Sequence, residues 1–380
     1  MKKFYFLAAM ASVALVSCVN EESVDYGLQE SNKAIVFNSP VVSGMSRAVA
    51  GEQPTTDTNK YSTSEKFRVY AQWDADKTFE NWVTQDSEAA ALYMNDVEVS
   101  YSGEITNGGW TSATPYYWPK EGTLTFAAYS PSDVNAFTHA YSATGLSVTD
   151  FTLQANTADQ YDFMYSSRSY NRTDNTNQLD KDEVHTGKSY NGVDILFHHA
   201  LTSIKFKVKA EADYGTTKIR VKQVSILNAY SQGDFAENHN ETTRKSSPEW
   251  TDQKLPVTYA AKTEATNQEL TTDVKQLAGA NDIILLPQLM KHSDTEHVSI
   301  EVYYSIQNGD GPEIPQTSVI SLVTGNNGDF YHENDTDVDI DQWKMGYRYT
   351  YTIIIGLNKI YFSPEVDYWK DITVTPDLDI

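Results

Sequence analysis

The stretch Ile204-Lys205-Phe206-Lys207-Val208-Lys209 alternates strictly between apolar and charged residues. Successive side chains of a β-strand point to opposite faces of a sheet, so this stretch predicts a strand with one buried and one exposed face. The 380-residue chain repeats short alternating runs between clusters of turn residues, and helical periodicity is scarce. We therefore expect an all-β protein built from β-sandwiches.

A change in composition divides the chain in two. Strand-like runs are followed by a polar stretch, residues 166–192, which is rich in Asn, Asp, Thr, Ser and Lys. A second set of runs begins at Val193 and is interrupted by a long polar loop expected at residues 230–248. We predict an N-terminal β-sandwich over residues 48–190 and a C-terminal β-sandwich over residues 191–380, each able to bury its own core.

The beginning of the chain has the layout of a lipoprotein signal peptide. Lys2 and Lys3 precede an apolar run that is too short to span a bilayer, and Leu15-Val16-Ser17-Cys18 closes that run. Cys18 is the only cysteine, and lipidation explains an odd cysteine in a secreted protein. We predict a signal peptide over residues 1–17 and a lipid on Cys18. The alternative is an ordinary signal peptide with an unmodified cysteine.

A short apolar strand and a linker follow. Ile35, Val36 and Phe37 form a run that is apolar on both faces, which predicts a strand buried on both sides. Arg47 then lies in a linker of small residues where a protease could cut between Arg47 and Ala48. Such a cut would remove the lipid and the strand together, so residues 18–47 form a candidate propeptide with a removable strand. The alternative for Arg47 is a solvated loop arginine.

Charge and composition exclude several classes of partner. The formal net charge is −23, and such a surface repels nucleic acid and anionic lipid headgroups. We therefore expect no nucleic-acid partner. No later segment is long and apolar enough to cross a membrane, so the lipid would be an anchor and not a span. With a single cysteine there is no disulfide, and packing alone must hold the cores.

Three groups of residues are candidate binding sites. Alternating aspartates on one strand face suit Ca²⁺, although a solvated acidic face in a very acidic protein is the plainer interpretation. His198 and His199 point to opposite faces of a strand and cannot share a metal. The aromatic cluster at residues 110–118 is either core or a platform for sugar. The aspartates are Asp335, Asp337, Asp339 and Asp341.

Catalytic motifs are weak. The chain has no Gly-x-Ser-x-Gly elbow, no His-Glu-x-x-His pair and no phosphate-binding glycine loop. Carboxylates are plentiful, but no sequence pattern selects a glycosidase pair among them. We expect a protein that is not an enzyme and that needs no cofactor.

Four stretches, in this order, are similar to the fimbrillin-like proteins, the pilin family of surface fimbriae in Bacteroides-type bacteria. The first pairs the apolar strand at 35–37 with the linker at 46–48, and the second joins Tyr117-Trp118-Pro119 to residues 124–131. The third runs from Leu196 to Phe206, and the fourth covers residues 346–351, 360–364 and Trp369. The resemblance spans nearly the whole chain.

This resemblance implies two tandem transthyretin-like β-sandwiches and a route of assembly. Relatives of this kind are exported as lipoproteins to the outer membrane and cut after an arginine by a trypsin-like protease, and Arg47 stands at that position. Losing the first strand opens a groove, which a strand from another subunit fills. The expected partners are other fimbrial subunits, the lipid anchor before maturation, and a host or bacterial surface receptor. The alternative function is a monomeric surface glycan-binding lipoprotein.

The far end of the chain supplies a candidate donor strand. Ile372, Val374, Leu378 and Ile380 fall on alternate positions and share one face of an extended strand. Pro376 lacks an amide hydrogen and forbids a central-strand role, so the segment suits an edge. The alternative is that these residues pair within their own domain as a last strand.

Overall fold

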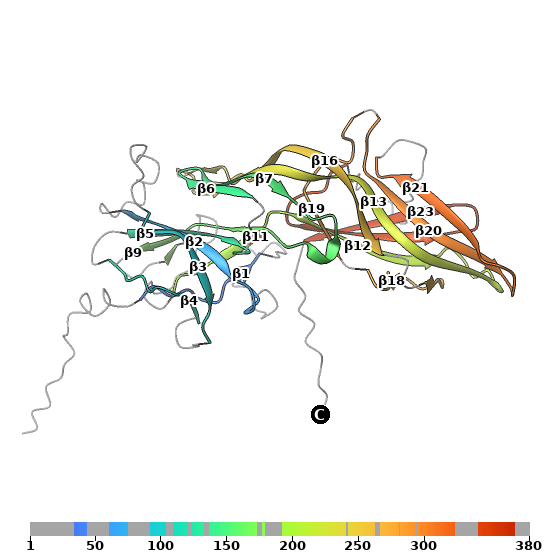
Figure 1. The fold of residues 1–380 in the computed structure, drawn as a ribbon, viewed down its shortest axis with the longest axis horizontal. Coiled ribbons are helices and arrows are strands. Elements are labelled where there is room, and N and C mark those ends of the chain that lie inside the picture. The colour runs from blue at the N-terminus through green and yellow to red at the C-terminus, as the bar shows by residue number, and fades with distance from the viewer. Residues whose placement is uncertain are drawn as a thin grey trace, which may run out of the picture.

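The all-β prediction is confirmed by a computed structural model. It describes residues 34–43, 61–74, 92–103, 109–119, 123–132, 137–172, 177–178, 192–240, 242–262, 267–280, 282–293, 295–323 and 341–368. Within these ranges the regular structure is β, apart from one 3₁₀ turn at Thr157–Asp159. No helix found there is long and apolar enough to cross a bilayer. The strands form an elongated molecule with one group of sheets toward each end (Figure 1).

A nine-stranded sheet forms the end of the molecule that carries the N-terminal strands. Its path ends at β1 on one side and at β4 on the other, while β9 pairs with β5 and β10 pairs with β9. The order along the path is β1 (Val41–Val42), β11 (Leu196–His199), β8 (Met164–Ser166), β5 (Thr123–Ser130), β2 (Phe67–Asp74), β3 (Met94–Tyr101) and β4 (Trp110–Ser112), with β9 at Ser169–Arg172 and β10 at Asn177–Gln178.

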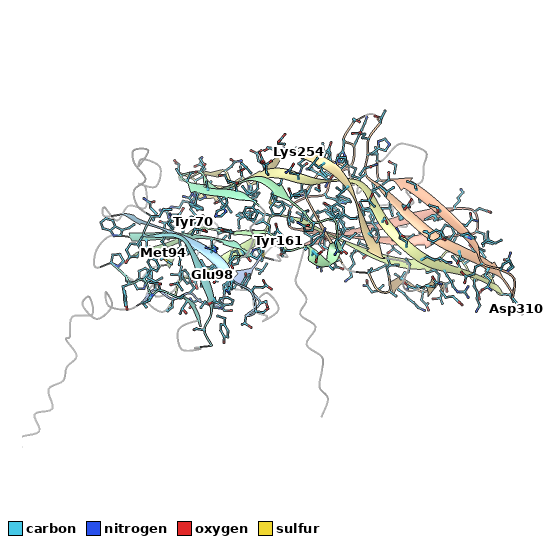
Figure 2. All side chains as sticks on the ribbon, in the orientation of Figure 1. Tyr70, Met94, Glu98, Tyr161, Lys254 and Asp310 are labelled. Carbon is cyan, nitrogen blue, oxygen red and sulfur yellow. The ribbon has the colours of Figure 1, made fainter. Side chains whose placement is uncertain are left out.

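A five-stranded sheet lies toward the other end, and a seven-stranded sheet extends from that end back over the nine-stranded sheet (Figure 1). The five-stranded sheet comprises β18 (Lys275–Gln276), β12 (Thr202–Ala210), β22 (Tyr347–Ile355) and β23 (Ile360–Tyr368), with β19 (Ile283–Leu285) also on β12. The seven-stranded sheet comprises β21 (Ile314–Ser321), β20 (Ser299–Asn308), β13 (Thr217–Ala236), β7 (Gly145–Thr152) and β6 (Thr138–Ser142), with β16 (Glu249–Lys262) and β17 (Gln268–Glu269) on β13. Asp310, in the turn between β20 and β21, lies far from Met94 of β3 (Figure 2).

The strand β13 corrects one expectation from the sequence. Residues 230–236 were expected to begin a polar loop, but they continue β13, which is 20 residues long. Their polarity is compatible with a strand because Ala229, Ser231, Gly233 and Phe235 alternate as buried positions. The next residues form a small hairpin of β14 (His239–Asn240) and β15 (Lys245–Ser246). Composition did not predict this part of β13, because most of its buried side chains are small.

Three apolar clusters fill the molecule. The largest lies among β12, β13, β20 and β22 and includes Trp343 and Tyr351. A second cluster surrounds Phe37, Phe67 and Phe126 on the nine-stranded sheet. The third includes Tyr70 of β2, Phe151 of β7 and Phe235 of β13, so it joins the nine-stranded sheet to the seven-stranded one.

Strands of the two predicted sandwiches interleave. β11 follows residue 190 but pairs in the nine-stranded sheet, whereas β6 and β7 precede residue 190 and join the sheet of β13. The end of β13 pairs with β7, with Gly233 opposite Phe151, and its beginning pairs with β20. The division of the chain at residue 190 into two sandwiches stays a prediction.

Candidate functional site

Residues 34–43, which we call the leader segment, lie between two strands that would otherwise be sheet edges. Without the leader segment, which includes β1, the path of the nine-stranded sheet would end at β11 and at β4. The leader segment contacts the chain at both of these ends. It therefore closes the sheet into a barrel-like arrangement, and closure is how β-structures remove exposed edges.

Backbone hydrogen bonds hold the leader segment to β4 and to the residues just after it. The Ile35 amide donates to the Tyr116 carbonyl at 2.6 Å, and the Phe37 amide donates to the Trp110 carbonyl at 2.9 Å. The bridges of Ala34 with Tyr117 and of Phe37 with Trp110 are antiparallel. On this side the leader segment acts as the neighbouring antiparallel strand.

The opposite side of the leader segment pairs in parallel with residues 193–197. The Val193 amide donates to the Val36 carbonyl at 2.8 Å, and the Asn38 amide donates to the Val193 carbonyl at 2.9 Å. Farther along, the Val41 amide donates to the Ile195 carbonyl at 3.0 Å, and the Ser43 amide donates to the Phe197 carbonyl at 2.7 Å. Removing the leader segment would therefore leave unpaired backbone groups on two strands at once.

The buried side chains of the leader segment complete an aromatic core. Ile35 is 2% exposed and Phe37 is fully buried, and both belong to the cluster of the nine-stranded sheet. The Phe37 ring meets the rings of Phe67 and Phe126 edge-on, each at a centroid distance of 5.9 Å. Burying one such side chain contributes about 1.5–3 kcal/mol. Val36 is only half-buried, so the burial expected on both faces of this strand occurs on one face.

A polar contact fixes the middle of the leader segment. The Asn38 side-chain amide donates to Asp194 Oδ1 at 2.7 Å and to the Gly192 carbonyl at 3.4 Å. Gly192 has φ of +132°, and a Cβ built there would lie 2.2 Å from Asn38 Oδ1. Only glycine fits this backbone conformation and this close approach. The sequence did not indicate that Asn38, Gly192 and Asp194 form a site. Asn38 and Asp194 are 156 residues apart in the chain and meet only through strand pairing.

Most other predicted site residues lie outside the described ranges. These are the lipidation site Cys18, the cleavage residues Arg47 and Ala48, the aspartates 335, 337 and 339, and the donor residues Ile372, Val374, Leu378 and Ile380. Asp341 is described, and its backbone carbonyl accepts a hydrogen bond from Met290. Among the described residues, no three His, Cys, Asp or Glu side chains are grouped so that they could hold a metal ion.

The two neighbouring histidines of β11 have separate partners. His198 Nε2 lies 2.7 Å from Ser167 Oγ, and His199 Nδ1 lies 2.6 Å from Asp162 Oδ2. Burial, with a smaller contribution from His199, lowers the pKa of His198 to about 4. His198 is half-buried, and we assign it a structural role in β11, the strand that pairs with the leader segment.

The aromatic cluster at residues 110–118 is mostly core. Trp110 is fully buried and Trp118 is 3% exposed, and both pack in the same cluster as Phe37. Tyr117 is 49% exposed and Tyr116 is half-buried. The Trp110 and Trp118 rings are therefore too buried to contribute to a surface platform for sugar.

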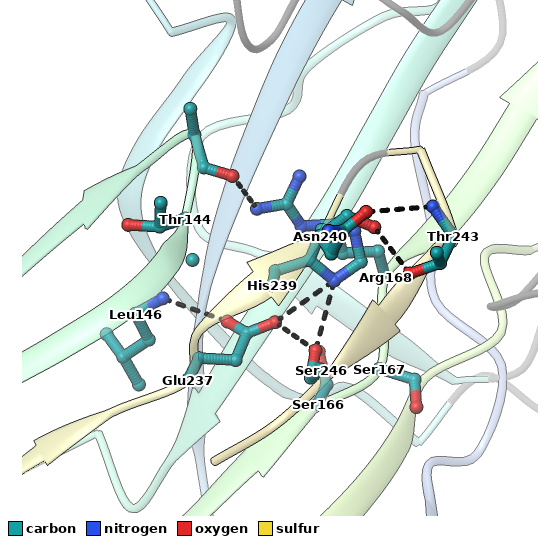
Figure 3. Close-up of polar contacts among 12 residues, drawn as sticks. Thr144, Leu146, Ser166, Ser167, Arg168, Glu237, His239, Asn240, Thr243 and Ser246 are labelled. Atoms are coloured by element: carbon teal, nitrogen blue, oxygen red, sulfur yellow. Dashed lines mark hydrogen bonds and ion pairs between the residues drawn. The ribbon is translucent and has the colours of Figure 1, made fainter. Parts of the chain in front are cut away.

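A second polar cluster, which the sequence did not indicate, lies near the β14–β15 hairpin. The buried Glu237 carboxylate accepts hydrogen bonds from the Leu146 amide at 2.8 Å and from Ser246 Oγ at 2.9 Å (Figure 3). Burial raises the pKa of Glu237, and burial together with Arg168 and Arg244 lowers the pKa of His239 to about 3. The fully buried Arg168 donates to the Ala143 carbonyl at 2.8 Å.

This polar cluster fastens strands from distant parts of the chain. Its members come from β7, from the turn between β8 and β9, and from the residues after β13. Each of the buried charges has hydrogen-bonding partners, which is the condition under which burial of charge is tolerated. We assign this polar cluster a structural role, because the Glu237 and Arg168 side chains are buried and hydrogen-bond to backbone groups of neighbouring segments.

Comparison with known proteins places these observations in a family. A sequence profile of a family described as fimbrillin-like matches residues 57–369, beginning after the leader segment. No curated protein matches the chain. A fimbrial protein from Bacteroides vulgatus ATCC 8482 is 16% identical, with a TM-score of 0.53 over 89% of this chain and 100% of the other. A protein described as a cell adhesion protein from Bacteroides uniformis ATCC 8492 is 15% identical, with a TM-score of 0.43 over 88% of this chain and 99% of its own.

Proposed function

The chain belongs to the fimbrillin-like family, and from this premise we propose that it is a structural or adhesive subunit of cell-surface fimbriae that assembles by strand exchange. Family membership supports the fimbrial role and a location at the cell surface. The finer steps are our proposal. The protein is exported as a lipoprotein on Cys18 to the outer membrane, is cut between Arg47 and Ala48, and then accepts a strand from another subunit.

The position of the leader segment carries this proposal. It bonds to Trp110 and Tyr116 on one side and to residues 193–197 on the other. A cut at Arg47, which follows the leader segment in sequence, would leave it attached by packing and hydrogen bonds alone. Its departure would open a groove with two unpaired edges, and an exposed edge is a template for adding a strand.

The proposed donor is the segment with residues 371–380 from a second subunit. Its apolar residues Ile372, Val374, Leu378 and Ile380 share one face, as an inserted strand requires. Backbone hydrogen bonds would supply affinity, and the pockets of Ile35, Phe37 and Val42 would select the side chains.

Proteolysis of the purified chain tests the proposal. A trypsin-like protease should give a stable product that begins at Ala48, and light scattering should then report a growing assembly. The matched control is Arg47→Gln, which should stay full-length and monomeric under the same protease. Deleting residues 371–380 should give a cleaved protein that stays monomeric alone but still accepts a strand from cleaved wild type.

Two results would contradict the proposal. The first is a protease-resistant product that still contains Phe37 although the chain has been cut at Arg47 and assembled. The second is assembly by the truncated protein on its own, which would exclude residues 371–380 as the donor.

A further inference from the structure

The leader segment advances by one residue more than the strand beside it. Phe37 pairs with Val193, and Val41 pairs with Leu196. Four steps along the leader segment therefore match three steps along its partner. An extra residue of this kind is a β-bulge, which leaves one residue unpaired and disrupts the ladder locally.

The burial pattern shows the same extra residue. The buried positions of the leader segment are 35, 37, 40 and 42, so the spacing of two residues is broken once, at Asn38 and Ser39. The partner strand keeps its spacing, with Val193, Ile195 and Phe197 all buried. Side chains alternate along an extended strand, so a regular neighbour of residues 193–197 would have its buried side chains two residues apart throughout.

The segment with residues 372–378 has this regular spacing. Its sequence is Ile-Thr-Val-Thr-Pro-Asp-Leu, and the leader segment from residue 35 is Ile-Val-Phe-Asn-Ser-Pro-Val-Val. With Ser39 left out, both segments carry two apolar residues, a proline and a further apolar residue at every second position. Ile372, Val374, Pro376 and Leu378 then take the places of the four buried leader residues.

We propose that the groove is built for a strand one residue shorter than the leader segment, and that residues 372–378 of a second copy of this chain are that strand. This inference rests on the proposed function and adds the register of the exchange. Val374 lies beside Val193, Pro376 beside Ile195 and Leu378 beside Phe197, without a bulge. In this register the leader segment occupies the groove with a bulge, and the inserted strand occupies it with a regular ladder.

Hydrogen bonding agrees with this register. The leader amides used on the side of residues 193–197 belong to Asn38, Val41 and Ser43, which correspond to Thr375, Asp377 and Asp379. The proline falls on Pro40, whose position already lacks an amide hydrogen. Thr375 falls on Asn38, where the Asp194 carboxylate and the Gly192 carbonyl accept a side-chain hydrogen bond. A threonine hydroxyl can donate to the same carboxylate.

Labelled peptides test the register on the full chain cut after Arg47. The probes are peptides of residues 33–43 and 370–380, and the measurement is fluorescence anisotropy during displacement of the leader segment. A serine inserted between Thr375 and Pro376 should weaken the second peptide about tenfold, because it introduces a bulge into an unbroken ladder. Deleting Ser39 from the first peptide should tighten it, because that change removes the bulge. A serine inserted after Asp379 is the matched control and should have little effect.

The outcomes separate the register from the proposed function. If both wild-type peptides bind and the serine before Pro376 strengthens binding, or if deletion of Ser39 weakens it, then the groove demands the bulge and the register is wrong while strand exchange stands. If neither wild-type peptide binds the cut protein, strand exchange and the register fail together. Val374→Phe in the second peptide checks the pocket assignment independently, since it should strengthen binding by refilling the space of Phe37.

Discussion

β22 and the leader segment each pair in parallel with a strand that is distant in the sequence, but the regularity of the pairing differs. β22 pairs with β12 in unbroken register from Ser203 opposite Arg348 to Ala210 opposite Ile355. The leader segment pairs with residues 193–197 through a few bonds interrupted by an extra residue. β22 is held by a long unbroken ladder, whereas the leader segment combines an interrupted ladder with the buried side chains of Ile35, Phe37 and Val42. The comparison teaches that a strand can fill a core while its pairing with one neighbour is interrupted.

Burial separates the two strands as well. From Tyr349 to Ile355 every residue of β22 is buried, so both faces of the strand are covered. In the leader segment only alternate positions are buried on either side of the bulge. Removing β22 would therefore expose apolar surface on both of its faces, whereas removing the leader segment would expose it mainly on one face.

Trp343→Ala should have the largest effect. Trp343 is fully buried beside β22 and donates from Nε1 to the Tyr351 hydroxyl at 3.0 Å. We expect the free energy of unfolding to fall by about 3–5 kcal/mol, equally in the intact and in the Arg47-cleaved chain. Urea denaturation measures this loss. The exposed Trp73 gives the matched variant, since Trp73→Ala should change stability by less than about 0.5 kcal/mol.

Phe37→Ala should have a smaller and conditional effect. Removing this ring empties a site between Phe67 and Phe126, and we expect a loss of about 3 kcal/mol in the intact chain. In the cleaved chain from which the leader segment has been washed, the same substitution should change nothing. Val36→Ala is the control in the same strand, because Val36 is only half-buried. An equal loss in both forms would mean that the leader segment does not leave.

Gly192→Ala should loosen the leader segment by an intermediate amount. The new methyl group would meet Asn38 and would force a left-handed backbone onto alanine, a strain of about 1–3 kcal/mol. Hydrogen exchange at the Phe37 amide should accelerate, while exchange in β22 should stay unchanged. Gly215→Ala is the matched control, since Gly215 also has a positive φ but has open space around it. Equal acceleration by both variants would remove any special role for the contact with Asn38.

Acid should weaken the strand beside the leader segment. The pKa of folded His198 is about 4, below the usual value of 6.5, so the unfolded chain binds more protons between these values. The contribution of His198 to stability is therefore complete above about pH 6.5 and is lost as the pH falls toward 4. At pH 5 the loss should be about 1–2 kcal/mol. His198→Gln should flatten this part of the stability profile, and an unchanged profile would assign the acid sensitivity to other groups.

The sequence predicted the strands better than their partners. Alternation at residues 204–209 located β12, because a half-buried strand carries the pattern in its own residues. Composition also predicted a strand at Ile35–Phe37, and these residues pair through isolated bridges while the regular strand β1 lies at Val41–Val42. The extra residue at Asn38–Ser39 could not be seen, since it exists only relative to residues 193–197. The Arg168–Glu237 cluster was missed for the same reason, because its members meet through pairing and not through proximity in sequence.

β13 has a mechanical consequence for a member of a fimbrial family. This single strand of 20 residues, about 65 Å of extended chain, pairs with β7 near one end and with β20 toward the other. It runs obliquely along the elongated molecule (Figure 1). Its inter-strand hydrogen bonds lie across the strand direction, so a pull along the strand would load many of them in shear together. Tension applied to β7 would therefore pass to β20 through the continuous backbone of β13.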